Sequence, residues 1–168
     1  MKPYILSLVL AFALLFTSCK KEEDTTGPTG PTDAIYGTWV SEGNNVAFGL
    51  RLTLKTKKIT ATFDRNNTYN VVAIDSTDVS VTYRGTFQSA GKTDTLIYPI
   101  SLNQQTPVAL KSQGIYQIKN NVMTYEVIQV EPPLQGFTPP TVQEGFGSTK
   151  YNGVPLGRTW VQVFVKQN

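Results

Sequence analysis

The sequence predicts an all-β protein, built as a single antiparallel up-and-down β-barrel of about eight strands. Apolar and polar residues alternate over most of residues 35–168, as in strands that have one buried and one solvated face. Turn-forming residues separate these runs at short intervals, and no run has the periodicity of an amphipathic helix. A flattened β-sandwich is the alternative. A barrel is favoured because closure removes exposed edge strands.

The alternating runs place the individual strands. They are found at residues 46–54, 59–63, 79–87, 96–102 and 161–165. Asp64-Arg65-Asn66-Asn67 and Lys119-Asn120-Asn121 lie between such runs and are typical of short turns, the second of a two-residue hairpin. Residues 158–166 are expected to form the last strand and to pair with the first. Residues 35–168 therefore form one domain, long enough to bury its own core.

The first 18 residues have the features of an export signal. Lys2 precedes the apolar run Tyr4 to Phe16, which has the length of a secretory signal and is too short to span a membrane as a helix. Leu15-Phe16-Thr17-Ser18-Cys19 resembles a lipobox, whose cysteine is acylated and becomes the new N-terminus. We therefore expect a lipoprotein signal peptide at 1–18, and at Cys19 a membrane anchor of fatty acyl chains such as palmitate.

Residues 19–34 are predicted to be the lipidated cysteine and a flexible linker. The charged run Lys20 to Asp24 cannot pack in a core, and it resembles the charged tags of surface-exposed lipoproteins of the Bacteroides group. Two Gly-Pro-Thr triplets at 27–32 favour an extended spacer. We expect an outer-membrane lipoprotein whose domain faces the periplasm or the cell surface.

Composition argues against several classes of function. The chain has 15 basic and 12 acidic residues, a balance that gives no support to nucleic acid binding. It has no histidine, and Cys19 is its only cysteine, so Ser-His-Asp and Cys-His catalytic sites and histidine metal sites are unavailable. No intrachain disulfide can form.

An enzyme with this composition would depend on paired carboxylates. The candidates are Asp64, Asp75, Asp78 and Asp94. Each lies in or beside a predicted turn, where an aspartate is explained by hydrogen bonds to the local backbone. We therefore predict a protein that is not an enzyme, with no catalytic residue, cofactor or metal.

Gly37-Thr38-Trp39 resembles the Gly-x-Trp signature that opens the first strand of lipocalins. The chain is thus similar to small lipocalin-like (calycin-type) bacterial lipoproteins of the Bacteroides group. The resemblance implies that Trp39 plugs one end of the barrel and that Arg158, from the last strand, packs across its ring. The alternative is that Trp39 is an ordinary core aromatic and Arg158 a solvated charge.

A lipocalin-like barrel has room for one small, mainly apolar ligand. The residues expected at such a site are Trp39, Phe48, Leu50, Leu52, Phe63, Tyr83, Phe87 and Arg158. If their side chains fill the barrel, no ligand enters. The alternative function is a surface accessory module that binds glycan or a partner protein through loop aromatics, for which Tyr116, Tyr151 and Trp160 are the candidates.

The long connection 131–157 is rich in proline and glycine and contains Phe137, Phe146 and Tyr151. Connections of this length tend to be functional or disordered, and the aromatics argue against disorder. They predict a segment that packs on the barrel, either as a lid over its mouth or along its outer wall. The outer wall is favoured because such segments more often cover apolar surface than act as a lid.

Overall fold

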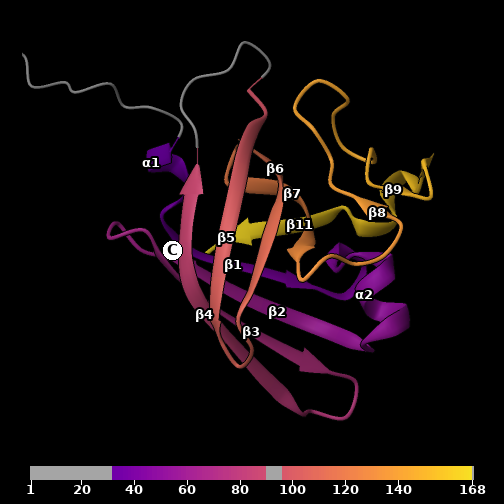
Figure 1. Ribbon diagram of the computed structural model, residues 1–168. Coiled ribbons are helices and arrows are strands. Elements are labelled where there is room, and N and C mark those ends of the chain that lie inside the picture. Colours follow the sequence, from indigo (N-terminus) through magenta and orange to yellow (C-terminus); the bar gives the residue numbers. More distant parts are fainter. Residues whose placement is uncertain (1–31, 90–95, 168) are drawn as a thin grey trace, which may run out of the picture.

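The computed structural model describes residues 32–89 and 96–167, and eight of its strands close into an antiparallel barrel (Figure 1). The predicted signal peptide, Cys19, most of the linker and Asp94 lie outside the described residues. The barrel strands are β1 (Gly37–Glu42), β2 (Thr56–Phe63), β3 (Thr68–Asp75), β4 (Ser80–Ser89), β5 (Tyr98–Thr106), β6 (Leu110–Lys119), β7 (Val122–Glu131) and β11 (Gln162–Lys166). The predicted barrel is confirmed.

Strands that are consecutive in the chain are neighbours in the barrel, in the order β1-β11-β7-β6-β5-β4-β3-β2, and β2 returns to β1. β11 pairs with β1 as expected, although it begins at Gln162 rather than at Arg158. A separate small sheet follows β7 and contains β8 (Phe137–Thr138), β9 (Lys150–Tyr151) and β10 (Val154–Pro155).

Both predicted turns are present. Asn120 and Asn121 have φ angles of 50° and 61° between β6 and β7, the left-handed conformation that a two-residue hairpin of this type requires at both positions. Asp64 and Asn67 close the turn between β2 and β3, because the Asn67 amide donates to the Asp64 carbonyl at 2.9 Å. These local signals fix the register of the two hairpins.

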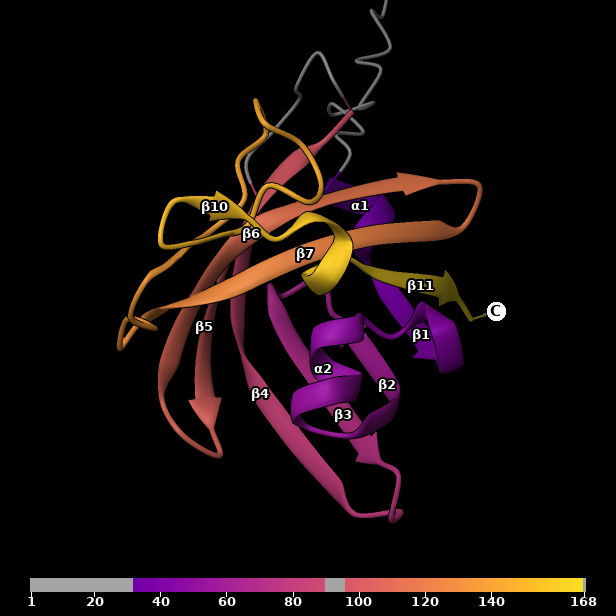
Figure 2. The same cartoon turned by 90° about the vertical axis from the view of Figure 1, so that its right-hand side faces the viewer.

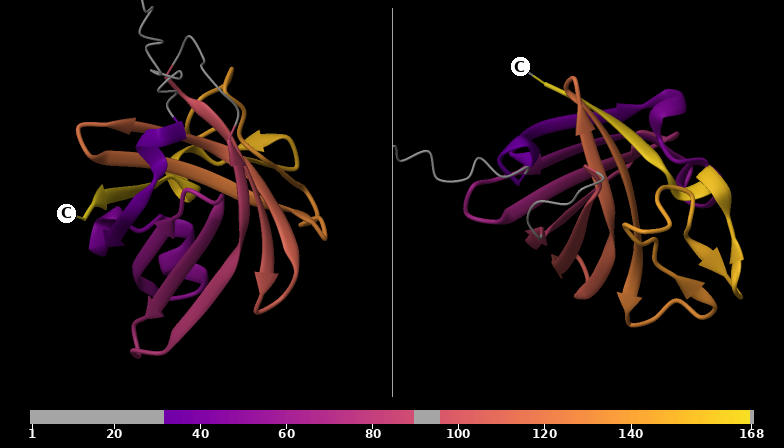
Figure 3. Two further views of the ribbon diagram at one scale, coloured as in Figure 1. Left: turned by 90° about the vertical axis from the view of Figure 1, so that its left-hand side faces the viewer. Right: turned by 90° about the horizontal axis from the view of Figure 1, so that it is seen from above.

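The barrel has two different ends, which we call the closed end and the open end. The closed end contains α1 (Thr32–Ile35) and the C-terminus, together with the turns at 64–67 and 120–121 (Figure 3, left). The open end contains the turns at 76–79 and 107–109 and, between β1 and β2, the short helix α2 (Phe48–Thr53). In Figure 2 the open end faces the viewer and α2 lies in front of β2 and β3.

The prediction of a strand at 46–54 is wrong. The segment follows a 3-10 turn, η1 (Gly43–Asn45), and forms α2 over most of its length. Its alternating apolar residues also contain a helical spacing of four, Val46, Leu50 and Leu54, and a short apolar run cannot distinguish the two periods. Leu50 of the helix and Leu54 directly after it border the barrel interior, although Leu54 is also 58% exposed.

The predicted face of the last strand is also wrong. The valines at 161, 163 and 165 suggest the buried face, but Gln162 and Phe164 are the side chains that line the barrel interior. Phe164 packs edge-on against Tyr125 of β7, with ring centroids 5.9 Å apart. The strand is short, and its valines are apolar whereas one of its two inward residues is the polar Gln162, so the sequence pattern indicates the wrong face.

The segment 132–157 lies on the outer wall of the barrel, against β7. Tyr125 and Val127 face the interior, so Glu126 between them faces outward. Glu126 is 0% exposed, and its carboxylate accepts hydrogen bonds from the Gly147 amide at 2.6 Å and from the Thr149 amide at 3.1 Å and hydroxyl at 2.5 Å. A buried carboxylate with three donors thus attaches the segment to the wall.

The aromatics of this segment pack beside the small sheet. The Phe137 ring lies 5.1 Å from that of Tyr151 and edge-on to Trp160 at 6.2 Å, and Phe146 is half-buried. The structure thus has the outer-wall arrangement rather than a lid. Within the described residues, no helix has both the length and the apolar character needed to cross a membrane.

Candidate functional site

We call the half of the barrel next to the open end the open half, and the other the closed half. The open half contains a cavity of about 310 Å³. Seven barrel strands and α2 contribute to its lining, so the site is assembled by the whole fold. The predicted interior residues Leu50, Phe63 and Tyr83 do line it. Further apolar lining comes from Leu54, Ile59, Ala61, Tyr69, Val71, Ala73, Leu102, Leu110, Tyr125, Val127 and Phe164.

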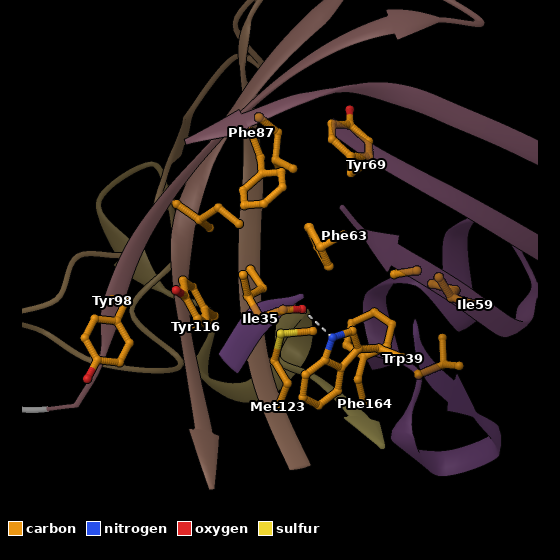
Figure 4. Close-up of a cluster of buried hydrophobic side chains, with 14 residues drawn as sticks. Ile35, Trp39, Ile59, Phe63, Tyr69, Phe87, Tyr98, Tyr116, Met123 and Phe164 are labelled. Atoms are coloured by element: carbon orange, nitrogen blue, oxygen red, sulfur yellow. Dashed lines mark hydrogen bonds between the residues drawn. The ribbon is translucent and has the colours of Figure 1, made fainter. Parts of the chain in front are cut away.

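The other predicted site residues lie elsewhere. Trp39 and Phe87 are buried in the packed core of the closed half (Figure 4). Phe48 and Leu52 are 55% and 67% exposed, because α2 turns them away from the barrel. Arg158 is exposed in η2 (Gly157–Trp160), the turn before β11.

Lys166 takes the position that the resemblance implied for Arg158. Its Nζ lies 5.2 Å from the Trp39 ring centroid, and Trp39 and Lys166 are partners in the pairing of β1 with β11. Antiparallel pairing sets the start of β1 against the end of β11, so a cation at the start of the last strand cannot reach Trp39. Trp39 is fully buried at the closed end, and its indole nitrogen donates a hydrogen bond to the Ile35 carbonyl at 2.7 Å.

Polar side chains gather at the open side of the cavity. They are Thr56, Gln104, Ser112, Gln129 and Gln162, each within three residues of the open end of its strand. Phe63 and Tyr69 lie toward the closed ends of β2 and β3. The cavity is therefore apolar at its base, and its polar side chains lie near its mouth. Among the described residues that line it, none is charged.

The three glutamines differ in their partners. The side-chain amide of Gln104 donates to the Val108 carbonyl at 2.8 Å, and that of Gln129 donates to the Pro132 carbonyl at 2.7 Å. Gln162 is only 4% exposed, and its Nε2 has no hydrogen-bond partner in the part of the chain that the structure describes. Sequence reasoning missed Gln162, because the alternation of valines placed it on the outer face.

Two tyrosines bring neutral hydroxyl groups to the cavity. Burial raises the pKa of Tyr69 to about 12. Burial, and secondarily the proximity of Tyr69, raises the pKa of Tyr125 far above its ordinary value. Both phenols therefore stay protonated at physiological pH, so they add hydrogen-bonding groups to the wall without adding charge.

The helix α2 covers part of the open end of the cavity and packs against Trp160 of η2. A Cβ atom on Gly49 would come within 2.8 Å of the Trp160 ring, so glycine is needed for this close approach. The contact leaves Leu50 of α2 and Leu54, the residue after the helix, over the cavity. Residues 48–54 thus cover part of the open end of the cavity. The aromatics of the predicted lid segment, Phe137, Phe146 and Tyr151, do not line the cavity.

Comparison with protein-family profiles, with curated proteins and with solved structures finds no match for this chain. The assignment of function therefore depends on the geometry of the site.

Two of the candidate carboxylates, those of Asp75 and Asp78, have partners near the turn that contains them. Asp75 Oδ1 accepts from the Thr77 hydroxyl at 2.8 Å and from the Thr77 and Val79 amides at 2.8 and 3.0 Å, and these bonds, the one from the hydroxyl foremost, lower the pKa of Asp75. Asp78 forms an ion pair with Lys57. The described residues contain no group of three potential metal ligands.

The aromatics considered for a surface platform are not gathered on the surface. Tyr116 is fully buried in the core, and Trp160 is packed between Gly49 and Phe137. Tyr151 is 47% exposed. The barrel interior is therefore the better candidate site.

Proposed function

We propose that this chain is a membrane-tethered, non-catalytic binding protein that holds one small, mainly apolar molecule inside its barrel. The observation that carries the proposal is the cavity of about 310 Å³ in the open half, beside a closed half that is packed with side chains. That volume lies at the lower end of the range for small-molecule sites.

The placement of the N-terminal helix agrees with a tether. α1 includes the last three residues of the predicted linker, 32–34, which are therefore helical, and it lies at the closed end, opposite α2 (Figures 1 and 3). If Cys19 carries the lipid, the linker joins the barrel at the end opposite its mouth, so the anchor does not obstruct the entry of a ligand.

The test is native mass spectrometry of residues 20–168 purified from a lipid-rich extract, combined with titration of an apolar fluorescent probe. We expect a bound small molecule that leaves on unfolding, and saturable probe binding to the emptied barrel. A protein that is free of ligand and does not bind the probe contradicts the proposal and favours a surface accessory module.

A cavity-filling variant locates the binding. Ala73→Phe places a phenyl ring in the cavity, and we expect it to weaken probe binding at least about tenfold while the barrel stays folded. Val72→Phe is the matched control, because residue 72 lies next to Ala73 on the outward face of β3. Equal binding by wild type and Ala73→Phe would place the probe outside the barrel.

A further inference from the structure

We infer that the ligand is a neutral amphiphile, and that an oxygen acceptor in its polar head binds the side-chain amide of Gln162 while its apolar part lies toward Phe63 and Tyr69. This inference rests on the proposed function and specifies the chemistry of the same cavity.

The first support is the unpartnered amide of Gln162. Buried side-chain nitrogens are nearly always hydrogen-bonded, because an unpaired donor loses its interaction with water and gains none in exchange. Gln104 and Gln129 follow that rule through the carbonyls of Val108 and Pro132. Nε2 of Gln162 has no such carbonyl among the described residues, although the side chain lines the cavity. A ligand that carries an acceptor oxygen would supply the hydrogen bond that this nitrogen lacks.

The second support is the position of Gln162 in the barrel. It is the first residue of β11 and comes two residues after Trp160, which packs against Gly49 of α2 at the open end, so it lies at the open side of the cavity. Phe63 and Tyr69 lie toward the closed ends of β2 and β3. A molecule with its polar head at Gln162 places its apolar part against this base.

The third support is the charge of the lining. None of the described residues that line the cavity is charged, and the phenols of Tyr69 and Tyr125 stay protonated. A carboxylate or phosphate in this cavity would lose its hydration without gaining a countercharge. An alcohol, ester or amide oxygen has a smaller desolvation cost and can still accept from Gln162.

The experiment compares four probes that share one chain length: 1-decanol, methyl decanoate, decanoate and decane. Each displaces the apolar fluorescent probe from full-length mature protein at pH 8, where decanoate is ionised. We expect decanol and methyl decanoate to bind at least about fivefold more tightly than decane, as one hydrogen bond predicts. Decanoate should bind least well, at least about tenfold more weakly than decanol.

The variant Gln162→Leu removes the donor and keeps a similar side-chain volume. We expect decanol and methyl decanoate to lose their advantage over decane, while decane binds as well as or better than before. The melting temperature should be unchanged or higher, because the substitution removes an unpaired buried amide. Gln113→Leu is the matched control, since Gln113 is an exposed glutamine of β6, and it should leave all four affinities unchanged.

The outcomes separate the two proposals. If none of the probes binds, the proposed function is wrong. If the apolar probe and decane bind but decanoate binds as tightly as decanol, or Gln162→Leu weakens all four ligands equally, the barrel binds apolar molecules and the inference about the polar head is wrong.

Discussion

The two halves of the barrel share the same strands but are filled differently. In the closed half, Trp39, Tyr116 and Met123 are fully buried and large, and the Tyr98 and Tyr116 rings lie 5.5 Å apart (Figure 4). In the open half, the same strands present smaller inward residues, such as Ala73 on β3 and Ser112 on β6. The comparison shows that the cavity results from side-chain size along the strands and needs no opening of the backbone.

The largest predicted effect tests this comparison directly. Trp39→Ala removes a fully buried indole from the packed half and should lower the free energy of unfolding by about 3–5 kcal/mol. Val71→Ala, at a position that already borders the cavity, should cost only about 1 kcal/mol. Urea denaturation of both variants measures the difference. Equal losses would show that the open half is packed as tightly as the closed half.

A second prediction concerns the outer wall. Glu126→Gln replaces one acceptor oxygen by an amide that faces the N–H groups of Gly147 and Thr149, and it should lower the free energy of unfolding by about 1–3 kcal/mol. Segment 132–157 should become the first site of limited proteolysis. Ligand affinity should stay within about twofold of the wild-type value, because Glu126 faces away from the cavity. A large loss of affinity would instead connect the wall to the site.

The smallest effect is a pH dependence in the alkaline range. The folded pKa of Tyr69 is raised to about 12, whereas the ordinary value is 10.0. The unfolded chain therefore loses the phenolic proton first, so stability is fully present below pH 10 and falls as pH rises toward 12. Unfolding titrations at stepped pH, beside a Tyr69→Phe variant, measure it. The variant should show a shallower decline; an unchanged slope would assign the effect to other groups.

The sequence by itself determined the features that depend on local pattern. Strand alternation predicted the barrel and some of its inward residues, including Phe63 and Tyr83, because side chains alternate between faces in every strand. Asn120-Asn121 predicted a hairpin because asparagine tolerates the left-handed conformation. The composition alone argues against histidine and thiol chemistry, since those side chains must be present in the chain to act.

Only the tertiary structure decided what depends on residues that are distant in the chain. Val46–Leu54 satisfies both a strand and a helical period, and contacts with the barrel and Trp160 select the helix. The pairing of β11 with its neighbours turns Gln162 inward, and its antiparallel direction brings Lys166 rather than Arg158 to Trp39. The cavity and its unpaired amide follow from these pairings, because an interior volume is set by side chains from strands far apart in sequence.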